Sequence, residues 1–324
     1  MKKHLLLLMG LLTMLCFAAL PSKHFMTFGS TDMQVISSNG ETPLLPSISY
    51  PYTEFDVPLP PHMADSGSTG GHSVYNPPNN TLTNGGATLG RVVIYDTRLS
   101  QNHTISCASC HIQKFGFTDS ATFSKGFDGE LTHRNSIGLA NARMQPILRF
   151  FWDATEDTMI NQVQAALTSS IEMGLDLDTL TQRLQNTSFY PSLFANAFGD
   201  PLITPHRTAA AIGQFVRSMV SVNSKYDIGF IQSGMATMID FPNYTDQENL
   251  GKSLFFSSEA ACATCHVDHN FAAFQPQNNG LDLVYNDKGL GEKTGFADHM
   301  AMFKAPPLRN IGLTAPYMHD GRFK

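Results

Sequence analysis

The chain has 324 residues, enough for two domains that each bury a core, and a formal net charge of −6 with no basic run. A mildly acidic chain is a poor binder of polyanions, so we exclude nucleic acid as a partner. Four of its five cysteines fall in two short motifs, and the fifth, Cys16, lies in an N-terminal apolar run. Once that run is removed, no cysteine is available for a structural disulfide.

The N-terminus has the pattern of a secretory signal peptide. A Lys-Lys pair precedes an apolar run over residues 5–20, which is followed by Pro21. The run is too short for a comfortable membrane span. We therefore predict a signal peptide over residues 1–20, export to the periplasm and no stable membrane insertion. Lipoprotein anchoring through Cys16 is disfavoured, because Leu15 stands where a small residue is needed.

Residues 21–86 are rich in Pro, Gly, Ser and Asn, as the stretches 58–61 and 66–71 show. Such a composition offers no periodic apolar face, which is typical of an extended or partly disordered arm. Ordered structure should therefore begin near Ala87.

Two motifs of the form Cys-x-x-Cys-His, at residues 107–111 and 262–266, organise the rest of the chain. In each, the two thiols can add to the two vinyl groups of one porphyrin while the adjacent imidazole binds its iron. We therefore predict two covalently attached c-type haems. The predicted attachment residues are Cys107, Cys110, Cys262 and Cys265, and the predicted iron ligands are His111 and His266.

The alternative is chemistry through the cysteine pairs alone. The four thiols could form one zinc site, or each pair could form a thioredoxin-like redox centre. Neither needs a histidine directly after both pairs, and a separation of about 150 residues is wide for one zinc site. These features favour haem.

The segments that flank the two motifs also repeat. Residues 89–96, which begin Leu-Gly-Arg, precede the first motif, and residues 250–257, which begin Leu-Gly-Lys, precede the second. An Arg-Asn pair follows each motif. The two pairs are Arg134-Asn135 and Arg309-Asn310. The same order twice indicates two related haem domains. We place them at residues 87–240 and 241–324.

Between the motifs the sequence pattern is helical. Apolar residues recur at i, i+4, i+7 and i+8 from Met159, the spacing of one buried stripe. Asp176 and Thr204 are suitable N-caps, and Pro205 suits the first position of a helix. Helices are predicted over residues 158–170, 175–184 and 204–222. Because strand patterns are scarce, the predicted fold class is mainly α, with two cytochrome c-like haem domains, long loops and little β.

From about Leu89 to its end, the chain resembles the bacterial dihaem cytochrome c peroxidases and their relative, the methylamine-utilisation enzyme MauG. Besides the haem motifs, the resemblance is carried by short stretches such as Phe-Gly-Phe-Thr-Asp and Phe-Trp-Asp. These stretches are residues 115–119, 134–135, 151–153, 303–310 and 315–321. The resemblance implies that the N-terminal haem, on His111, reacts with peroxide and that the C-terminal haem, on His266, receives electrons.

Three residues match positions that the family uses in catalysis. Trp152 matches an electron relay between the two haems, although a lone tryptophan can equally fill a core. Gln162 and Glu172 match polar residues on the open face of the reactive haem, where peroxide cleavage needs a proton moved from one oxygen to the other. A solvated acid at a helix end is the alternative for Glu172, but its apolar neighbours Ile171 and Met173 favour partial burial.

The resemblance also implies a calcium ion between the domains, held by Asn135, Thr314 and Pro316. Side-chain and main-chain oxygen donors of this kind suit calcium, with water completing the shell. Ordinary turn residues are the alternative at these positions.

One departure from the family pattern concerns the reactive haem. Phe127 stands where many of these peroxidases carry a removable histidine. We therefore predict that this haem is open without reductive activation. His133, six residues further on, is the alternative candidate for this histidine, but we expect it at the surface or in indirect support of the haem.

A second departure is at the end of the sequence. It stops at Lys324, before the methionine or tyrosine that is the distal ligand of the second haem in the family, and we interpret it as a fragment. Met302 and Met318 are internal candidates for that ligand, although methionine is more often core filler. His319 is expected to support the haem indirectly.

Together these features predict a periplasmic dihaem peroxidase that reduces hydrogen peroxide to water. A small cytochrome c or cupredoxin would supply the electrons, and a homodimer is compatible with this function. Two alternatives stay open: a MauG-like oxidase that modifies a protein side chain, and a dihaem electron carrier without catalysis.

Overall fold

The computed structural model describes residues 75–144, 149–267 and 269–324, and nearer the N-terminus residues 43, 45, 50–52 and 59–63. The predicted signal peptide over residues 1–20 and most of the predicted arm over 21–86 lie outside these residues. The chain from Gln34 to Lys324 clusters as one unit. The division into two haem domains at residue 240 stays a prediction.

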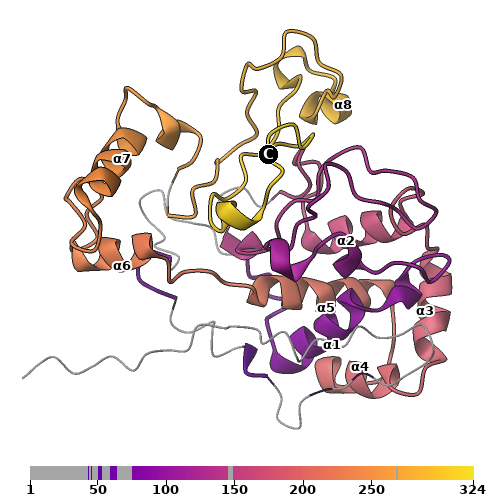
Figure 1. The fold of residues 1–324 in the computed structure, drawn as a ribbon. Coiled ribbons are helices and arrows are strands. Elements are labelled where there is room, and N and C mark those ends of the chain that lie inside the picture. Colours follow the sequence, from indigo (N-terminus) through magenta and orange to yellow (C-terminus); the bar gives the residue numbers. More distant parts are fainter. Residues whose placement is uncertain are drawn as a thin grey trace, which may run out of the picture. The chain divides into compact units, whose positions relative to one another are not determined.

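The described chain is mainly helical, as predicted, and long loops join the helices (Figure 1). Its extended segments pair only through isolated bridges. The α-helices are α1 (Asn84–Ile94), α2 (Met159–Thr168), α3 (Leu177–Gln185), α4 (Tyr190–Phe198), α5 (Pro205–Ser218), α6 (Lys225–Gln232), α7 (Asp246–Phe256) and α8 (Leu290–Thr294). Short 3-10 turns are η2 (Thr97–Leu99), η3 (Cys107–Ser109), η4 (Gln113–Phe115), η5 (Ala142–Met144), η6 (Cys262–Thr264), η7 (Ala297–His299) and η8 (Ile311–Leu313). No helix in this part of the chain is long and apolar enough to cross a membrane.

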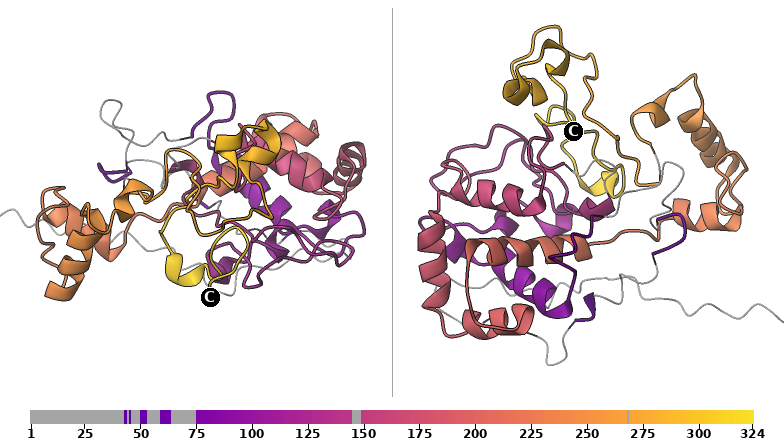
Figure 2. Two further views of the ribbon diagram at one scale, coloured as in Figure 1. Left: turned by 90° about the horizontal axis from the view of Figure 1, so that it is seen from above. Right: turned by 180° about the vertical axis from the view of Figure 1, so that it is seen from behind.

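Helix α5 is the centre of the group formed by helices α1 to α5. It packs against α1 and α2, and α1 also packs against α4 (Figures 1 and 2). From Thr208 to Ser218 every residue of α5 is buried, as expected of a helix enclosed on all sides. Gly90 of α1 allows this packing, because a Cβ there would lie 2.0 Å from the carbonyl oxygen of Ala211. Only glycine lets the two helices approach so closely.

The helices predicted between the haem motifs are present, with small shifts at their ends. Asp176 and Thr204 cap α3 and α5 as predicted, each accepting a hydrogen bond from a backbone N–H of the first turn. Helix α5 ends at Ser218, before its predicted end. The chain turns away there, and the Ser221 N–H donates to the Asn141 Oδ1 at 2.6 Å.

Parts of the predicted arm are ordered and buried. Order begins before Ala87, because the Thr83 side chain caps the start of α1. Further upstream, Tyr52, His62 and Met63 are 2%, 6% and 0% exposed. These described points of the arm therefore pack into the rest of the chain.

Candidate dihaem site

The first haem motif forms a tight 3-10 turn, η3. The Ser106 N–H donates to the Ser109 Oγ at 3.0 Å and holds the turn closed. The His111 N–H donates to the Cys107 carbonyl oxygen at 2.9 Å. The turn therefore brings the backbone of the histidine back beside the first cysteine.

The second motif repeats this geometry in η6. The His266 N–H donates to the Cys262 carbonyl oxygen at 3.0 Å. A single antiparallel bridge follows each motif. The bridged pairs are Ile112 with Thr118 and Val267 with Ala272. The duplication seen in the sequence is thus also a duplication of local structure.

Both imidazoles are held in the tautomer that can bind iron. His111 Nδ1 donates to the Phe117 carbonyl oxygen at 3.0 Å, and His266 Nδ1 donates to the Phe271 carbonyl oxygen at 3.0 Å. Because a carbonyl only accepts, Nδ1 carries the proton and Nε2 keeps its lone pair for a metal. Both acceptors have left-handed backbone, with φ of 62° at Phe117 and 56° at Phe271, which is uncommon for residues other than glycine. Burial also lowers the pKa of His111, which keeps the ring neutral.

The thiols of the first motif differ from those of a thioredoxin-like centre. All four are free, without a disulfide. Burial raises the pKa of Cys107 to about 12 and that of Cys110 to about 11, whereas a thioredoxin-like centre needs a lowered thiol pKa. Among the described residues, no group of three or more His, Cys, Asp or Glu side chains is arranged to hold a metal ion.

One cavity of about 1390 Å³ reaches both motifs. Its wall includes Cys107, Cys110 and His111 from the first motif and Cys265 and His266 from the second. The cavity exceeds the ~300–1,000 Å³ of typical small-ligand sites. Paired thiols beside an imidazole that is protonated on Nδ1 are the groups that covalent haem attachment needs. The residues present therefore fit c-type haem at both motifs.

Glu172 and Gln162 line this cavity. Gln162 lies on α2, and Glu172 lies in the turn that follows, where its N–H donates to the Ser169 Oγ at 3.2 Å. The Glu172 carbonyl oxygen accepts from the Phe127 N–H at 3.0 Å. Burial raises the pKa of the Glu172 carboxyl to about 7. A carboxyl with this pKa can both accept and donate a proton near neutral pH.

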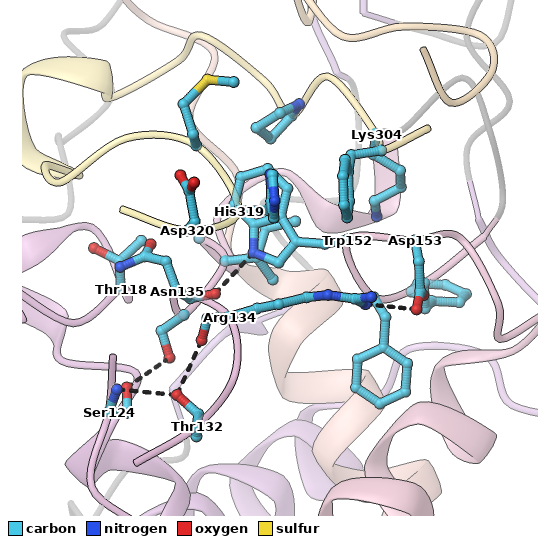
Figure 3. A pocket seen from close by; sticks show the side chains of 18 of the residues that line it. Thr118, Ser124, Thr132, Arg134, Asn135, Trp152, Asp153, Lys304, His319 and Asp320 are labelled. Carbon is cyan, nitrogen blue, oxygen red and sulfur yellow. Dashed lines mark hydrogen bonds and ion pairs between the residues drawn. The ribbon is translucent and has the colours of Figure 1, made fainter. Parts of the chain in front are cut away.

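Trp152 is held by contacts from both halves of the chain. Its indole N–H donates to the Asn135 carbonyl oxygen at 2.7 Å (Figure 3). Its own carbonyl oxygen accepts from the Lys304 N–H at 2.7 Å. Trp152 is half-buried and lines the cavity that reaches both haem motifs. It is therefore a wall residue of that cavity.

Arg134 joins the two halves beside Trp152. Its guanidinium pairs with Asp153 at 2.5 Å and, through two N–H groups, with Asp287 at 2.7 and 2.9 Å. It also lies 5.4 Å from the centre of the Phe303 ring. Burial lowers the pKa of Arg134, but the carboxylates of Asp287 and Asp153 outweigh this effect, and the net pKa lies above its usual value. The guanidinium therefore keeps its charge. In the sequence, Arg134 was recognised as part of the repeat and of the resemblance, but this role was missed because Asp287 is 153 residues away.

Comparison with known proteins places this geometry in a family. A sequence model of the di-haem cytochrome c peroxidases matches residues 84–233. The methylamine utilization protein MauG of Methylorubrum extorquens is 32% identical over 255 residues, which cover 77% of this chain and 69% of the relative. The cytochrome c551 peroxidase of Nitrosomonas europaea is 31% identical over 240 residues, which cover 72% and 68%. The chain belongs to the di-haem cytochrome c peroxidase and MauG family.

Solved structures agree with this membership. A crystal structure of a MauG-like protein associated with microbial copper homeostasis matches with a TM-score of 0.69 and 33% identity, covering 82% of this chain and 79% of that one. The diheme peroxidase BthA of Burkholderia thailandensis shares the fold with a TM-score of 0.60 at 23% identity. A member of the di-haem peroxidase and MauG family is an oxidoreductase with two c-type haems, in agreement with the two motifs.

The residues predicted for calcium in this dihaem family also line the cavity. They are Asn135, Thr314 and Pro316. The Asn135 Nδ2 donates to the carbonyl oxygens of Ala121 and Thr122 at 3.0 and 3.2 Å. These bonds fix the amide and leave its Oδ1 as the donor for a cation. The calcium ion itself stays a prediction.

Phe127, the position that departs from the family pattern, contacts the turn of Glu172. The Phe127 N–H binds the Glu172 carbonyl oxygen. Its ring packs so closely on Gly174 that a Cβ there would lie 2.4 Å from it. His133 is exposed and lines the cavity. That the reactive dihaem site is open without activation stays a prediction.

The C-terminal segment contributes to the same dihaem cavity. Met318 and His319 line it, whereas Met302 is not among the described lining residues. The His319 ring stacks on Phe303 with centres 3.7 Å apart, and its carbonyl oxygen accepts from the Asn135 N–H at 2.7 Å. Burial lowers the pKa of His319. Neutral His319 is thus a packing residue between the two halves.

Proposed function

We propose that this protein is a peroxidase that reduces hydrogen peroxide to water with electrons from a small cytochrome c or cupredoxin. The electrons would enter at the haem on His266 and pass through Trp152 to the haem on His111. The observation that carries the proposal is Glu172, a carboxyl with a pKa of about 7 in the wall of the cavity that His111 also lines. Haem at the first motif would supply the iron that exchanges electrons with peroxide.

Glu172 would act by moving a proton. Reduction of one peroxide to two waters takes up two electrons and two protons, and the oxygen–oxygen bond breaks readily only when the departing oxygen leaves as water. As a carboxylate, Glu172 can accept a proton from one peroxide oxygen and return it to the other. Gln162 can donate a hydrogen bond from its amide and orient the peroxide.

Trp152 would carry electrons between the two haems. Its place in the wall of a cavity that both motifs line supports this role. The hydrogen bond from its indole N–H to Asn135 orients the ring, and the bond from the Lys304 N–H to its carbonyl oxygen holds its backbone. A fixed ring keeps the transfer distance constant from one turnover to the next.

The proposal also assigns the remaining site residues. The four motif cysteines would form thioether bonds to haem, and Asn135, Thr314 and Pro316 would hold one calcium ion between the halves. The signal peptide predicted over residues 1–20 supports a periplasmic location, where haem c is attached and small electron donors are present.

A MauG-like oxidase that modifies a protein side chain is the second candidate. It is favoured by the 32% identity to the MauG of Methylorubrum extorquens and by the 33% identity to a MauG-like crystal structure. In such an enzyme the electrons come from a protein substrate rather than from a small donor. The two candidates share the haems, Glu172 and Trp152, and differ in the source of electrons.

Steady-state peroxide consumption with a reduced small cytochrome c tests the proposal. Glu172→Gln should lower the rate by ~10²–10⁴, the usual contribution of a general acid–base group. Glu130→Gln, in an exposed loop, is the matched control and should keep the rate. Spectra of both variants should show two intact haems.

Three outcomes separate the functions. Turnover with the small donor that depends on Glu172 supports the peroxidase. Reaction with peroxide but no turnover of any small donor would point to the MauG-like oxidase. An oxidised protein that binds neither cyanide nor peroxide would be an electron carrier.

A further inference from the structure

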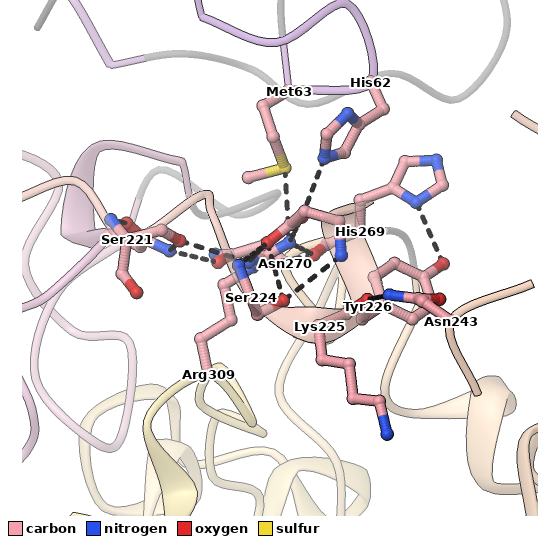
Figure 4. Close-up of polar contacts among 12 residues, drawn as sticks. His62, Met63, Ser221, Ser224, Lys225, Tyr226, Asn243, His269, Asn270 and Arg309 are labelled. Atoms are coloured by element: carbon pink, nitrogen blue, oxygen red, sulfur yellow. Dashed lines mark hydrogen bonds and ion pairs between the residues drawn. The ribbon is translucent and has the colours of Figure 1, made fainter. Parts of the chain in front are cut away.

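Two residues of the predicted arm, His62 and Met63, are buried against α6 and the loop after the second haem motif, although Pro61 beside them is exposed. The His62 side chain has no exposed surface, and Met63 is 0% exposed. The His62 Nε2 donates to the Asp227 Oδ1 at 2.7 Å, and the Met63 Sδ lies 3.7 Å from the Arg309 Nη2 (Figure 4). The His62 ring also packs edge-to-face with the rings of Phe230 and His269, with ring centres 5.5 Å apart in both pairs.

Asp227 is the centre of this buried network. Its carboxylate accepts from His62, from the Ser224 Oγ at 2.6 Å, and from Arg309 at 2.7 and 2.8 Å. The Asp227 and Arg309 side chains are only 2% and 5% exposed. Burial raises the pKa of Asp227, but the hydrogen bonds from Arg309 and His62 outweigh it and hold this pKa well below its usual range. Loss of a partner would leave a buried charge uncompensated.

Arg309 connects the network to the second haem motif. Its Nε and Nη2 donate to the His269 carbonyl oxygen at 2.9 and 2.6 Å. Its guanidinium carbon lies 5.9 Å from the centre of the Phe271 ring. The Phe271 carbonyl oxygen accepts from the His266 Nδ1. A continuous series of contacts therefore runs from His62 to the imidazole that would bind iron.

The first repeat uses its equivalent arginine differently. Arg134, the counterpart of Arg309, pairs with Asp153 and Asp287 and packs over Phe303. Its three guanidinium nitrogens all bind these two carboxylates. The link to the loop of the haem ligand is thus a property of the second repeat.

We propose that His62 and Met63 form a clamp that positions the ligand loop of the second haem, residues 266–267 and 269–271, with His62 as a positioning residue. The inference rests on the proposed function only in taking His266 as an iron ligand. The group that accepts the Nδ1 proton sets the basicity of a ligating imidazole, and with it the potential of the iron. A more basic imidazole favours the ferric state. Loss of the clamp loosens the Nδ1–carbonyl bond and raises the potential.

Spectroelectrochemical titration of the full chain with both haems, without peroxide or donor, tests the clamp. His62→Ala removes the contact with Asp227, and His62→Gln restores an N–H donor at the position of Nε2. His206→Ala, at the exposed start of α5, is the matched control. A Cys262→Ala/Cys265→Ala variant retains only the first haem and so identifies the potential of the second. If His62→Ala does not load both haems, His62→Asn withdraws the donor with a smaller loss of volume.

We expect His62→Ala to raise the ferrous-to-ferric ratio of the second haem about tenfold at a fixed potential, equal to ~59 mV for one electron. The potential of the first haem should not change, and in His62→Gln the potential of the second haem should be close to that of the wild-type protein. Amide hydrogens of Ala272 and Ala273, which bond within and beside the ligand loop, should exchange faster in His62→Ala only.

An unchanged or lower potential of the second haem, or an equal shift of both haems, would overturn the clamp. These results are independent of the proposed activity. Failure of the peroxidase proposal would show as absent peroxide turnover in a protein whose second potential still responds to His62. Failure of the haem assignment would show as two haems retained in the double-cysteine variant.

Discussion

Gly90 and Gly251 occupy the same place in the two repeats but have opposite surroundings. A Cβ on Gly90 would lie 2.0 Å from the backbone of Ala211 on α5, whereas a Cβ on Gly251 would meet nothing within 4 Å. Beside Gly251, Leu250 and Leu254 are 53% and 44% exposed. The repeat is thus conserved in sequence order, while the packing of its first helix is not.

The two glycines form a matched pair for mutation. Gly90→Ala should lower the free energy of unfolding by about 3 kcal/mol, because neither backbone can move aside easily. Gly251→Ala should raise it by roughly 0.5–1 kcal/mol, because alanine is the better helix former. Urea unfolding of both variants measures the difference. If Gly251→Ala lowered the free energy of unfolding as much as Gly90→Ala, the open surroundings of Gly251 on α7 would be contradicted.

Replacement of Trp152 tests the route of electrons between the haems. Trp152→Phe keeps most of the ring volume but removes the N–H bound to Asn135 and the easily oxidised indole. Electron transfer from the second haem to the first should slow by an order of magnitude or more, with a loss of stability of ~1 kcal/mol for the hydrogen bond. Stopped-flow spectroscopy of the half-reduced protein follows this step.

The control for Trp152→Phe is Tyr317→Phe. Tyr317 also lines the cavity, and its hydroxyl donates one hydrogen bond, to the Ile311 carbonyl oxygen at 2.9 Å, which the variant lacks. The Tyr317→Phe protein should transfer electrons at the wild-type rate. If both variants slow the transfer equally, the effect belongs to the packing of the cavity and not to the indole.

Local patterns in the sequence predicted much of this architecture. The apolar period from Met159, together with the caps Asp176 and Thr204, predicted α2, α3 and α5. The motif residues were predicted from the chemistry of haem attachment, and the polar pair Gln162 and Glu172 from the resemblance to the dihaem peroxidases. The polar pair and all the motif cysteines and histidines except Cys262 line one cavity. The apolar period, the helix caps and the motif spacing each depend on residues that are close together along the chain, so they can be recognised in a single sequence.

The contacts that sequence reasoning missed are distant along the chain. His62 stands in a proline-rich stretch without a periodic pattern, and its partner Asp227 is 165 residues away. Arg134 and Asp287 are similarly remote. Helix α6 was also missed, although Ser224 and Asp227 form a capping box that marks its start. The pairings of His62 with Asp227 and of Arg134 with Asp287, unlike the start of α6, are decided by tertiary packing, which no local pattern specifies.

Lys304 should make stability depend on pH in the alkaline range. It is 7% exposed, its Nζ donates to the Arg149 carbonyl oxygen at 3.0 Å, and burial lowers its pKa to about 8. Between pH 8 and the ordinary lysine pKa of 10.5, the unfolded chain binds more protons than the folded one, so stability rises with pH. This rise in the free energy of unfolding amounts to about 3 kcal/mol at most, and Lys304→Met should abolish it.

The measurement for Lys304 is urea unfolding at several pH values between 8 and 10.5. Lys114→Met, at an exposed position, is the control and should keep the wild-type slope. A Lys304→Met protein that keeps the same slope would show that the titration belongs to another group.

Glu172 should give the peroxide reaction its pH dependence. The proposed role requires the carboxylate, and burial raises the pKa of this group to about 7. Below that pH the carboxyl is protonated, so the rate of reaction with peroxide should fall about tenfold per pH unit. Stopped-flow rates between pH 5 and 8 measure this ionisation, and Glu172→Gln should give a slow rate without it.

Stability offers an independent check that the ionisation belongs to Glu172. Because its folded pKa lies above the ordinary value of 4.5, the folded chain binds more protons than the unfolded one between pH 4.5 and about 7. Stability should therefore fall as the pH rises through this window, and Glu172→Gln should remove that fall. A rate profile that titrates near pH 7 in Glu172→Gln as well would assign the proton transfer to a different residue.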